Sequence, residues 1–158
     1  MKKYILLMLF CLTLILSACS HGEEDTREYS GIIGDGKTLG YEYTVKKEQN
    51  KFSWKVGYIG NISIIEESAA NQEDLVNFMN AVNDSKLALV KLIVSVSYFL
   101  IVIITTLILY KKNRKVLKDG GIIITILAGI AIYIAFKESL NLISSLQDAK
   151  YYYLILVK

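Results

Sequence analysis

Few side chains in this sequence could do covalent or metal chemistry. Cys11 and Cys19 are the only cysteines and His21 is the only histidine, so clusters of thiolate or imidazole ligands cannot be assembled. Glu66 and Glu67 are adjacent, and neighbouring residues of a strand point to opposite faces. The sequence contains no phosphate-loop, zinc-protease or nucleophile-elbow motif. It therefore predicts a protein that is not an enzyme and holds no cofactor or metal. The Cys19 thiol remains as the one reactive group with a candidate role.

Cys19 ends a segment that has the layout of a secretory signal. Met1-Lys2-Lys3 is positively charged, residues 4–16 are apolar, and Leu16-Ser17-Ala18-Cys19 follows. These last four residues resemble the lipobox of bacterial lipoproteins. The resemblance implies that residues 1–18 are a cleaved signal peptide and that Cys19 carries a thioether-linked diacylglyceryl group, a palmitate-type lipid. The alternative is an uncleaved transmembrane helix, but an apolar run of about 15 residues falls short of the about 20 that a bilayer crossing needs.

The next segments read as a tether and a small folded domain. Residues 19–28 are polar and acidic, as in a flexible linker. Apolar and polar residues then alternate over 39–46, 52–58 and 62–64, which predicts three strands of an antiparallel meander. Turns are expected at Gln49-Asn50 and Gly60-Asn61. A shorter strand is expected at Ile32-Ile33, with a turn at Gly34-Asp35-Gly36.

One amphipathic helix is predicted after the strands. Asn71 is expected to cap it, and Glu73 and Asp74 favour its first turn. Its apolar stripe is expected to cover the meander, which gives an α+β domain over residues 29–86. The stripe consists of Leu75, Phe78, Met79 and Val82.

The aromatic residues of the meander allow two interpretations. Their strict alternation favours a sheet core centred on Trp54, and the alternative is an exposed platform for a glycan or peptide. The residues concerned are Tyr41, Tyr43, Phe52, Trp54 and Tyr58.

Two segments are apolar enough to cross a membrane. Residues 87–110 include 19 without a charge, from Leu92 to Tyr110, which suffices for a first transmembrane helix. Residues 120–136 give a second, slightly short one. Small residues at Thr125, Gly129, Ala131 and Ala135 favour packing against the first span. The predicted fold class is a membrane protein in which a small extracytoplasmic α+β domain precedes a two-helix transmembrane hairpin.

The connection between the spans, residues 111–119, is rich in positive charge. Basic residues in short loops stay on the cytoplasmic side, so residues 19–86 and the tail 137–158 are expected outside. The lipobox requires the same orientation for Cys19. Binding of anionic lipid head groups or nucleic acid is the less favoured use of this charge. The topology-determining residues are Lys111, Lys112, Arg114, Lys115 and Lys118.

The tail leaves two structures open. Residues 139–150 could prolong the second helix, and residues 151–157 are expected either to anchor at the membrane interface or to add a strand to the sheet. A third span is disfavoured because Asp148 and Lys150 would lie in hydrocarbon.

The sequence thus predicts a lipid-anchored, multi-pass protein of the bacterial plasma membrane. It contacts lipid through Cys19 and two spans and does not bind nucleic acid. Its expected action is contact with an envelope or membrane protein, as an accessory subunit, sensor or immunity-type factor. There are two alternatives. One is an outer ligand-binding lipoprotein, and the other is a pore or transport component lined by the hydroxyl groups of the spans, namely Ser95, Ser97, Thr105, Thr106 and Thr125.

Overall fold

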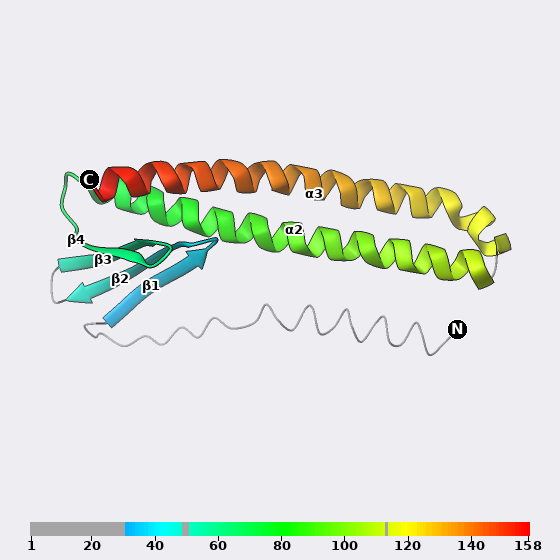
Figure 1. The fold of residues 1–158 in the computed structure, drawn as a ribbon, viewed down its shortest axis with the longest axis horizontal. Coiled ribbons are helices and arrows are strands. Elements are labelled where there is room, and N and C mark those ends of the chain that lie inside the picture. Colours follow the sequence, from blue (N-terminus) through cyan, green and yellow to red (C-terminus); the bar gives the residue numbers. More distant parts are fainter. Residues whose placement is uncertain (1–30, 49–50, 113) are drawn as a thin grey trace.

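The computed structural model describes residues 31–48, 51–112 and 114–158 of the chain, without the side chains of 116–119. It consists of a four-stranded sheet followed by two long helices that lie side by side, and the sheet sits against one end of the helix pair (Figure 1). The strands are β1 (Gly31–Thr38), β2 (Tyr41–Glu48), β3 (Lys51–Tyr58) and β4 (Asn61–Glu66). The helices are α2 (Gln72–Lys112) and α3 (Arg114–Leu156).

The sheet is an antiparallel meander in the order β1-β2-β3-β4. The predicted meander is therefore present, with a full fourth strand at its start. The turn expected at Gly34-Asp35-Gly36 is wrong, because these residues pair with β2 and only a register shift between Ile32 and Gly34 interrupts the ladder. This bulge leaves Ile33 without a partner residue on β2, and the glycine-rich stretch after it pairs with β2 in regular register.

Two tight turns at one end of the sheet resemble each other. Leu39-Gly40 and Ile59-Gly60 all have positive φ, the pattern of a type I′ turn, whose twist matches that of a hairpin. The Ile59 amide donates to the Gly40 carbonyl at 2.8 Å, so the two turns are joined. Leu39, expected in a strand, is thus a turn residue, and the second turn lies one residue earlier than predicted.

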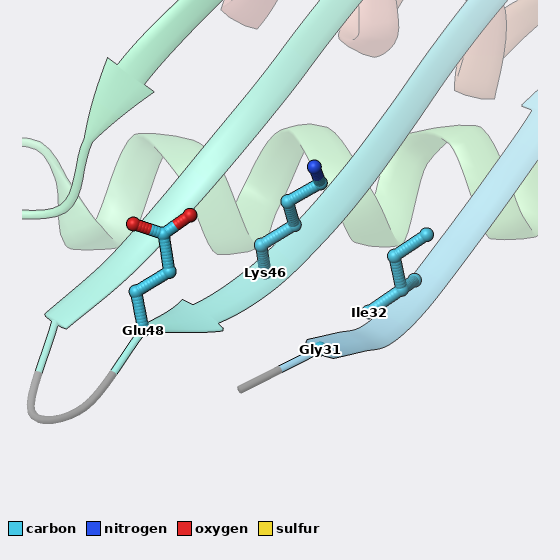
Figure 2. Close-up of a pocket in the computed structure, with 4 residues that line it drawn as sticks. All are labelled: Gly31, Ile32, Lys46 and Glu48. Carbon is cyan, nitrogen blue, oxygen red and sulfur yellow. The ribbon is translucent and has the colours of Figure 1, made fainter. Parts of the chain in front are cut away.

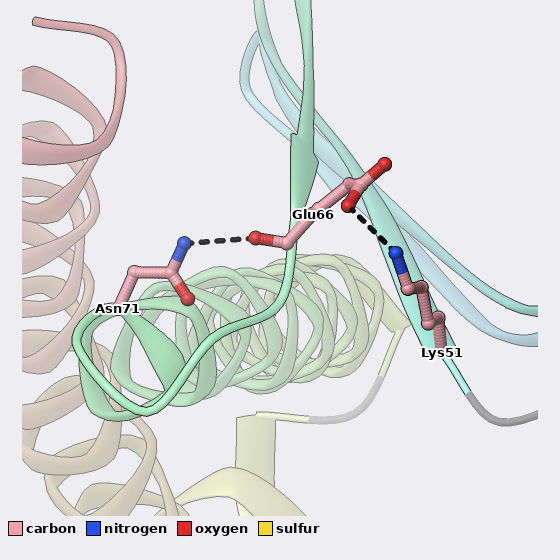
Figure 3. Close-up of polar contacts among 3 residues, drawn as sticks. All are labelled: Lys51, Glu66 and Asn71. Atoms are coloured by element: carbon pink, nitrogen blue, oxygen red, sulfur yellow. Dashed lines mark hydrogen bonds and ion pairs between the residues drawn. The ribbon is translucent and has the colours of Figure 1, made fainter.

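Helix α2 begins where the sequence indicates, but Asn71 acts differently. Its carbonyl accepts the bond from the Leu75 amide, which places Asn71 at the N-cap. Its side chain, however, donates to the Glu66 carbonyl (Figure 3). It also accepts from the Ser68 amide, so it holds the linker from β4 rather than capping the helix. Asparagine side chains readily make such local bonds to turns. Glu73 and Asp74 lie in the first turn, as expected.

The main core lies between the sheet and the near ends of both helices. Strands β2 and β3 contribute buried aromatic and β-branched residues, and α2 contributes Leu75, Phe78, Ala81 and Val82. The predicted packing of the helix stripe over the meander is confirmed. The interpretation of the aromatic residues as core is also confirmed, because Tyr41, Tyr43 and Trp54 are buried and Phe52 and Tyr58 pack against them.

The tail is helical to Leu156, so the added strand is wrong. Helix α3 returns along α2, and its last turns reach the sheet (Figure 1). Ala149 is fully buried in the core, and Leu146, Tyr152, Tyr153 and Leu156 pack against it. The aromatic run of the tail therefore closes a core that the strands and α2 alone would leave open.

Candidate functional site

The junction of the sheet with both helices is an aromatic cluster. The Tyr41 ring lies 4.4 Å from that of Tyr58 in a stacked geometry, and 6.4 Å from Phe78 and 6.2 Å from Tyr153 edge-on, measured between ring centroids. Such aromatic pairs add roughly 0.5–1.5 kcal/mol each beyond their buried area. Burial raises the pKa of Tyr41, and the neighbouring Tyr58 and Tyr153 raise it further. The cluster therefore fixes β2, β3, α2 and α3 in one unit.

Two side-chain hydrogen bonds strengthen this unit. The Tyr43 hydroxyl donates to Asn83 Oδ1 at 3.0 Å and so links β2 to α2. Trp54 Nε1 donates to Glu67 Oε2 at 2.7 Å and links β3 to the segment before α2. The adjacent Glu66 forms an exposed ion pair with Lys51, with Nζ and Oε2 3.6 Å apart (Figure 3). The two carboxylates thus have separate partners, which does not suit an acid–base pair.

Beyond the core, α2 and α3 meet along a seam in which most of the buried residues are small. On α2 the seam contains Ser85, Ala88 and Ser95, and on α3 it contains Ala131 and Glu138, all of them buried. Their spacing of three and seven residues is that of helices with coiled-coil packing. Of the small residues predicted to pack against the first span, Ala131 is buried and Ala135 is half-buried, whereas Thr125 and Gly129 are exposed.

Outside this seam, both helices expose apolar side chains along most of their length. Examples are Ile104, Leu107, Ile122 and Phe136, each more than half exposed. Both helices are long and apolar enough to cross a membrane, over Gln72–Lys112 and Gly120–Leu156. At 1.5 Å per residue, 41 residues extend about 60 Å, roughly twice a hydrocarbon core. Each helix can therefore cross a bilayer and still reach the sheet.

The predicted basic residues gather where the two helices meet at the far end. Lys111 and Lys112 lie in the last turn of α2, and Arg114, Lys115 and Lys118 lie in the first turns of α3. The expected loop 111–119 is thus helical over all of its described residues. The Arg114 guanidinium lies 4.8 Å from the centroid of the Tyr110 ring. The helix dipole favours positive charge at a C-terminus and disfavours it at an N-terminus. The charges of Arg114 and Lys115 therefore do not stabilise the start of α3.

Three of the hydroxyl groups considered for a pore form hydrogen bonds within their own helices. Ser95 donates to the Leu92 carbonyl at 3.0 Å, Thr106 to Val102 at 2.7 Å and Thr125 to Gly121 at 2.9 Å. Ser95 is also buried in the seam. Each bond occupies the donor of its hydroxyl group, which leaves the oxygen lone pairs as the part that could contact water.

Two shallow hollows occur on the described surface. One, of about 150 Å³, lies at the start of β1 and the end of β2 and is lined by Gly31, Ile32, Lys46 and Glu48 (Figure 2). The other, of about 400 Å³, lies beside the last turns of α3, where Tyr151 and Leu154 are among its lining residues. Ligand sites are concave and hold a few buried polar groups, and neither hollow does.

The remaining predicted site is Cys19, which lies outside the described residues together with the signal segment and the tether. Among the described residues, no group of three or more His, Cys, Asp or Glu side chains is placed to hold a metal. The residues of this junction that the sequence analysis missed are Tyr152 and Tyr153 at the end of α3, which pack against the core. Their signal was present in the apolar spacing of 142, 146, 149 and 153, which continues the helix through the tail. No protein-family model, curated protein or solved structure matches this chain.

Proposed function

We propose that this chain is a lipid-anchored protein of the bacterial plasma membrane that crosses the bilayer twice and holds a small sheet domain outside. It acts by contact with another membrane or envelope protein, as an accessory subunit, sensor or immunity-type factor. One observation carries the proposal: α2 and α3 run without interruption from the domain core, at Phe78 and Tyr153, into segments with exposed apolar side chains.

The continuity of the helices matters because it couples the sheet to the spans. A domain on a flexible linker moves independently of its anchor, whereas two packed helices transmit rotation and translation. A contact made by the sheet thus changes the helix pair in the bilayer, and the reverse also holds. Such coupling is what a sensor or accessory subunit requires.

Orientation follows from charge and from the signal segment. The cluster Lys111, Lys112, Arg114 and Lys115 supports a cytoplasmic position for the far end of the hairpin. The resemblance of residues 16–19 to a lipobox supports an outer position for the other end. These two arguments for orientation, the basic cluster and the lipobox resemblance, do not depend on the packing of the aromatic core.

The absence of a deep polar cavity in the described part of the chain favours protein contact over small-ligand binding. The aromatic side chains that a ligand platform would need are in the core. Exposed apolar residues do occur on the outer face of the sheet, with Ile62 and Ile64 on the edge strand β4. An edge strand with unpaired backbone groups is a common docking site for another protein.

The experiment is an affinity capture of tagged full-length chain from native membranes in mild detergent, preceded by crosslinking in living cells. The matched variants are Ile64→Lys, on the outer sheet face, and Lys55→Ser, which faces the same side on β3. We expect a stoichiometric partner that the Ile64→Lys variant loses and the Lys55→Ser variant keeps. Recovery of this chain without any other protein, under several mild conditions, would contradict the proposal.

A further inference from the structure

Helix α3 has a second apolar face, opposite the seam that it forms with α2. Near the sheet this outer α3 face consists of Leu140, Ile143, Gln147, Tyr151 and Leu154, which recur at i, i+3, i+7, i+11 and i+14 and share one side of a helix. Leu140, Ile143, Tyr151 and Leu154 are each more than half exposed. No other described element lies beyond α3 on this side (Figure 1).

The face continues without a break into the apolar segment of α3. Phe136, Tyr133 and Gly129 precede Leu140 at the same spacing, and Phe136 and Tyr133 are exposed. In the bilayer, lipid can cover such residues. The part from Leu140 onward lies beyond Lys137, next to a folded domain in water, and there lipid cannot cover it. A single partner that covers the whole face must therefore cross the membrane and continue outward as a helix.

We propose that the outer α3 face binds the same face of a second copy of this chain, giving a parallel pair of α3 helices about a two-fold axis along the membrane normal. Two copies inserted with the same topology present this face at the same depth and over the same length. A self-complementary face on one element is the requirement for such an isologous dimer. The inference rests on the membrane placement proposed above.

Three features of the face suit a parallel pair. A Cβ added at Gly129 would have no atom within 4 Å, so the backbone there is open to close approach by another helix. Gln147 has an amide that both donates and accepts, and a single polar residue in an apolar helix interface fixes its register.

The third feature is charge. Asp148 and Lys150 are two residues apart, about 200° around the helix axis, and so flank the face on opposite sides. Both are exposed, and neither forms an ion pair within the described residues. In a parallel two-fold pair, the flank that carries Asp148 in one copy lies beside the flank that carries Lys150 in the other. The opposite charges then attract, whereas a flank of like charges would disfavour the pair.

The test is disulfide crosslinking of the full-length chain in native membranes. Leu140→Cys places a thiol on the proposed interface, and Asn141→Cys places one at the same depth, exposed but about 100° around the helix. Both are made in a Cys11→Ala background, with that background as the parent. Under mild oxidant we expect at least a fivefold greater yield of an adduct of twice the chain mass for Leu140→Cys. Equal yields for the two variants, no adduct, or an adduct with a different protein would each overturn the dimer.

A second variant tests the pairing mode. Gly129→Ile in the Leu140→Cys chain fills the open space and should lower the adduct several-fold, while Trp54 fluorescence shows an unchanged fold. An unchanged yield would overturn close approach at Gly129. Resistance of the chain to alkaline extraction is measured on the same membranes. Extraction of the chain would overturn the membrane placement itself, whereas retention without an adduct overturns only the dimer.

Discussion

The ring of Tyr153, in the last turns of α3, lies edge-on to the ring of Tyr41 at the start of β2, with 6.2 Å between their centroids. Tyr153 also lies 5.8 Å from Tyr58 and 6.4 Å from Phe78. The folded domain at this end of the helix pair is therefore built from the sheet and from both helices. This arrangement offsets the small size of the sheet, because a domain of about 60 residues buries a modest fraction of its surface.

The first prediction concerns this aromatic contact. Tyr153→Ala should lower the free energy of unfolding by about 2–4 kcal/mol, since it removes a ring that contacts three others. Tyr153→Phe keeps the ring and should stay within about 0.5 kcal/mol of the parent. The measurement is denaturant unfolding of the full chain in detergent, followed by fluorescence of Trp54, the only tryptophan. Equal stabilities of the two variants would show that α3 does not complete the core.

The second prediction concerns two glycines of β1. A Cβ at Gly36 would lie 2.5 Å from Cε1 of Tyr43, so Gly36→Ala should displace that ring, break its bond to Asn83 and cost about 1–3 kcal/mol. A Cβ at Gly34 would have nothing within 4 Å. Gly34→Ala should therefore be neutral or slightly stabilising. Thermal unfolding of both variants compares them, and a Gly36→Ala chain as stable as Gly34→Ala would contradict the packing of Tyr43 over β1.

The third prediction separates the two adjacent carboxylates. Glu67→Ala leaves the buried Trp54 indole without its acceptor and should cost about 1–3 kcal/mol. Glu66→Ala breaks only an exposed ion pair and should cost less than about 1 kcal/mol. Trp54 emission should also shift only in the Glu67→Ala variant. The account fails here if the two alanine variants have the same stability and the same emission.

The fourth prediction is a loss of stability at alkaline pH. Because burial raises the pKa of Tyr41, the folded chain holds this proton more tightly than the unfolded chain. The resulting stabilisation is complete below the ordinary tyrosine pKa of about 10 and is lost as the pH rises through the raised value. Tyr41→Phe should flatten the fall in unfolding free energy above about pH 10. A slope that is the same in the variant and the parent would contradict a titrating Tyr41.

Much of this architecture can be predicted from the sequence because it is encoded in short periodic patterns. The period of two over residues 41–58 specifies strands, and the spacing of Leu75, Phe78 and Val82 specifies the helix face that covers them. The apolar segments, and the charge at Lys111–Lys115, are equally local signals.

Other features depend on tertiary contacts and cannot be predicted from local sequence patterns. The Gly34-Asp35-Gly36 stretch has the composition of a turn, yet it pairs with β2 as a strand. The Tyr43 ring occupies the space beside Gly36 that a Cβ atom would fill, which explains a glycine within this strand. Tyr151-Tyr152-Tyr153 has high strand propensity, but packing of Tyr152 and Tyr153 on the core keeps it helical. The Asn71 side chain could either cap α2 or bond to the linker from β4. It bonds to the linker, at the Ser68 amide and the Glu66 carbonyl.

The most direct test of the account is the side of the membrane on which each end of the helix pair lies. Cysteines at Lys37, exposed on β1, and at Lys115, exposed near the start of α3, are introduced one at a time into the Cys11→Ala background. This parent keeps Cys19. The parent and both variants are treated with a membrane-impermeant maleimide on intact bacterial cells, and labelling is counted above that of the parent. We predict that Lys37→Cys is labelled in intact cells and that Lys115→Cys is labelled only after permeabilisation. Labelling of Lys115→Cys in intact cells, or protection of Lys37→Cys, would contradict the two-span arrangement with an external sheet domain.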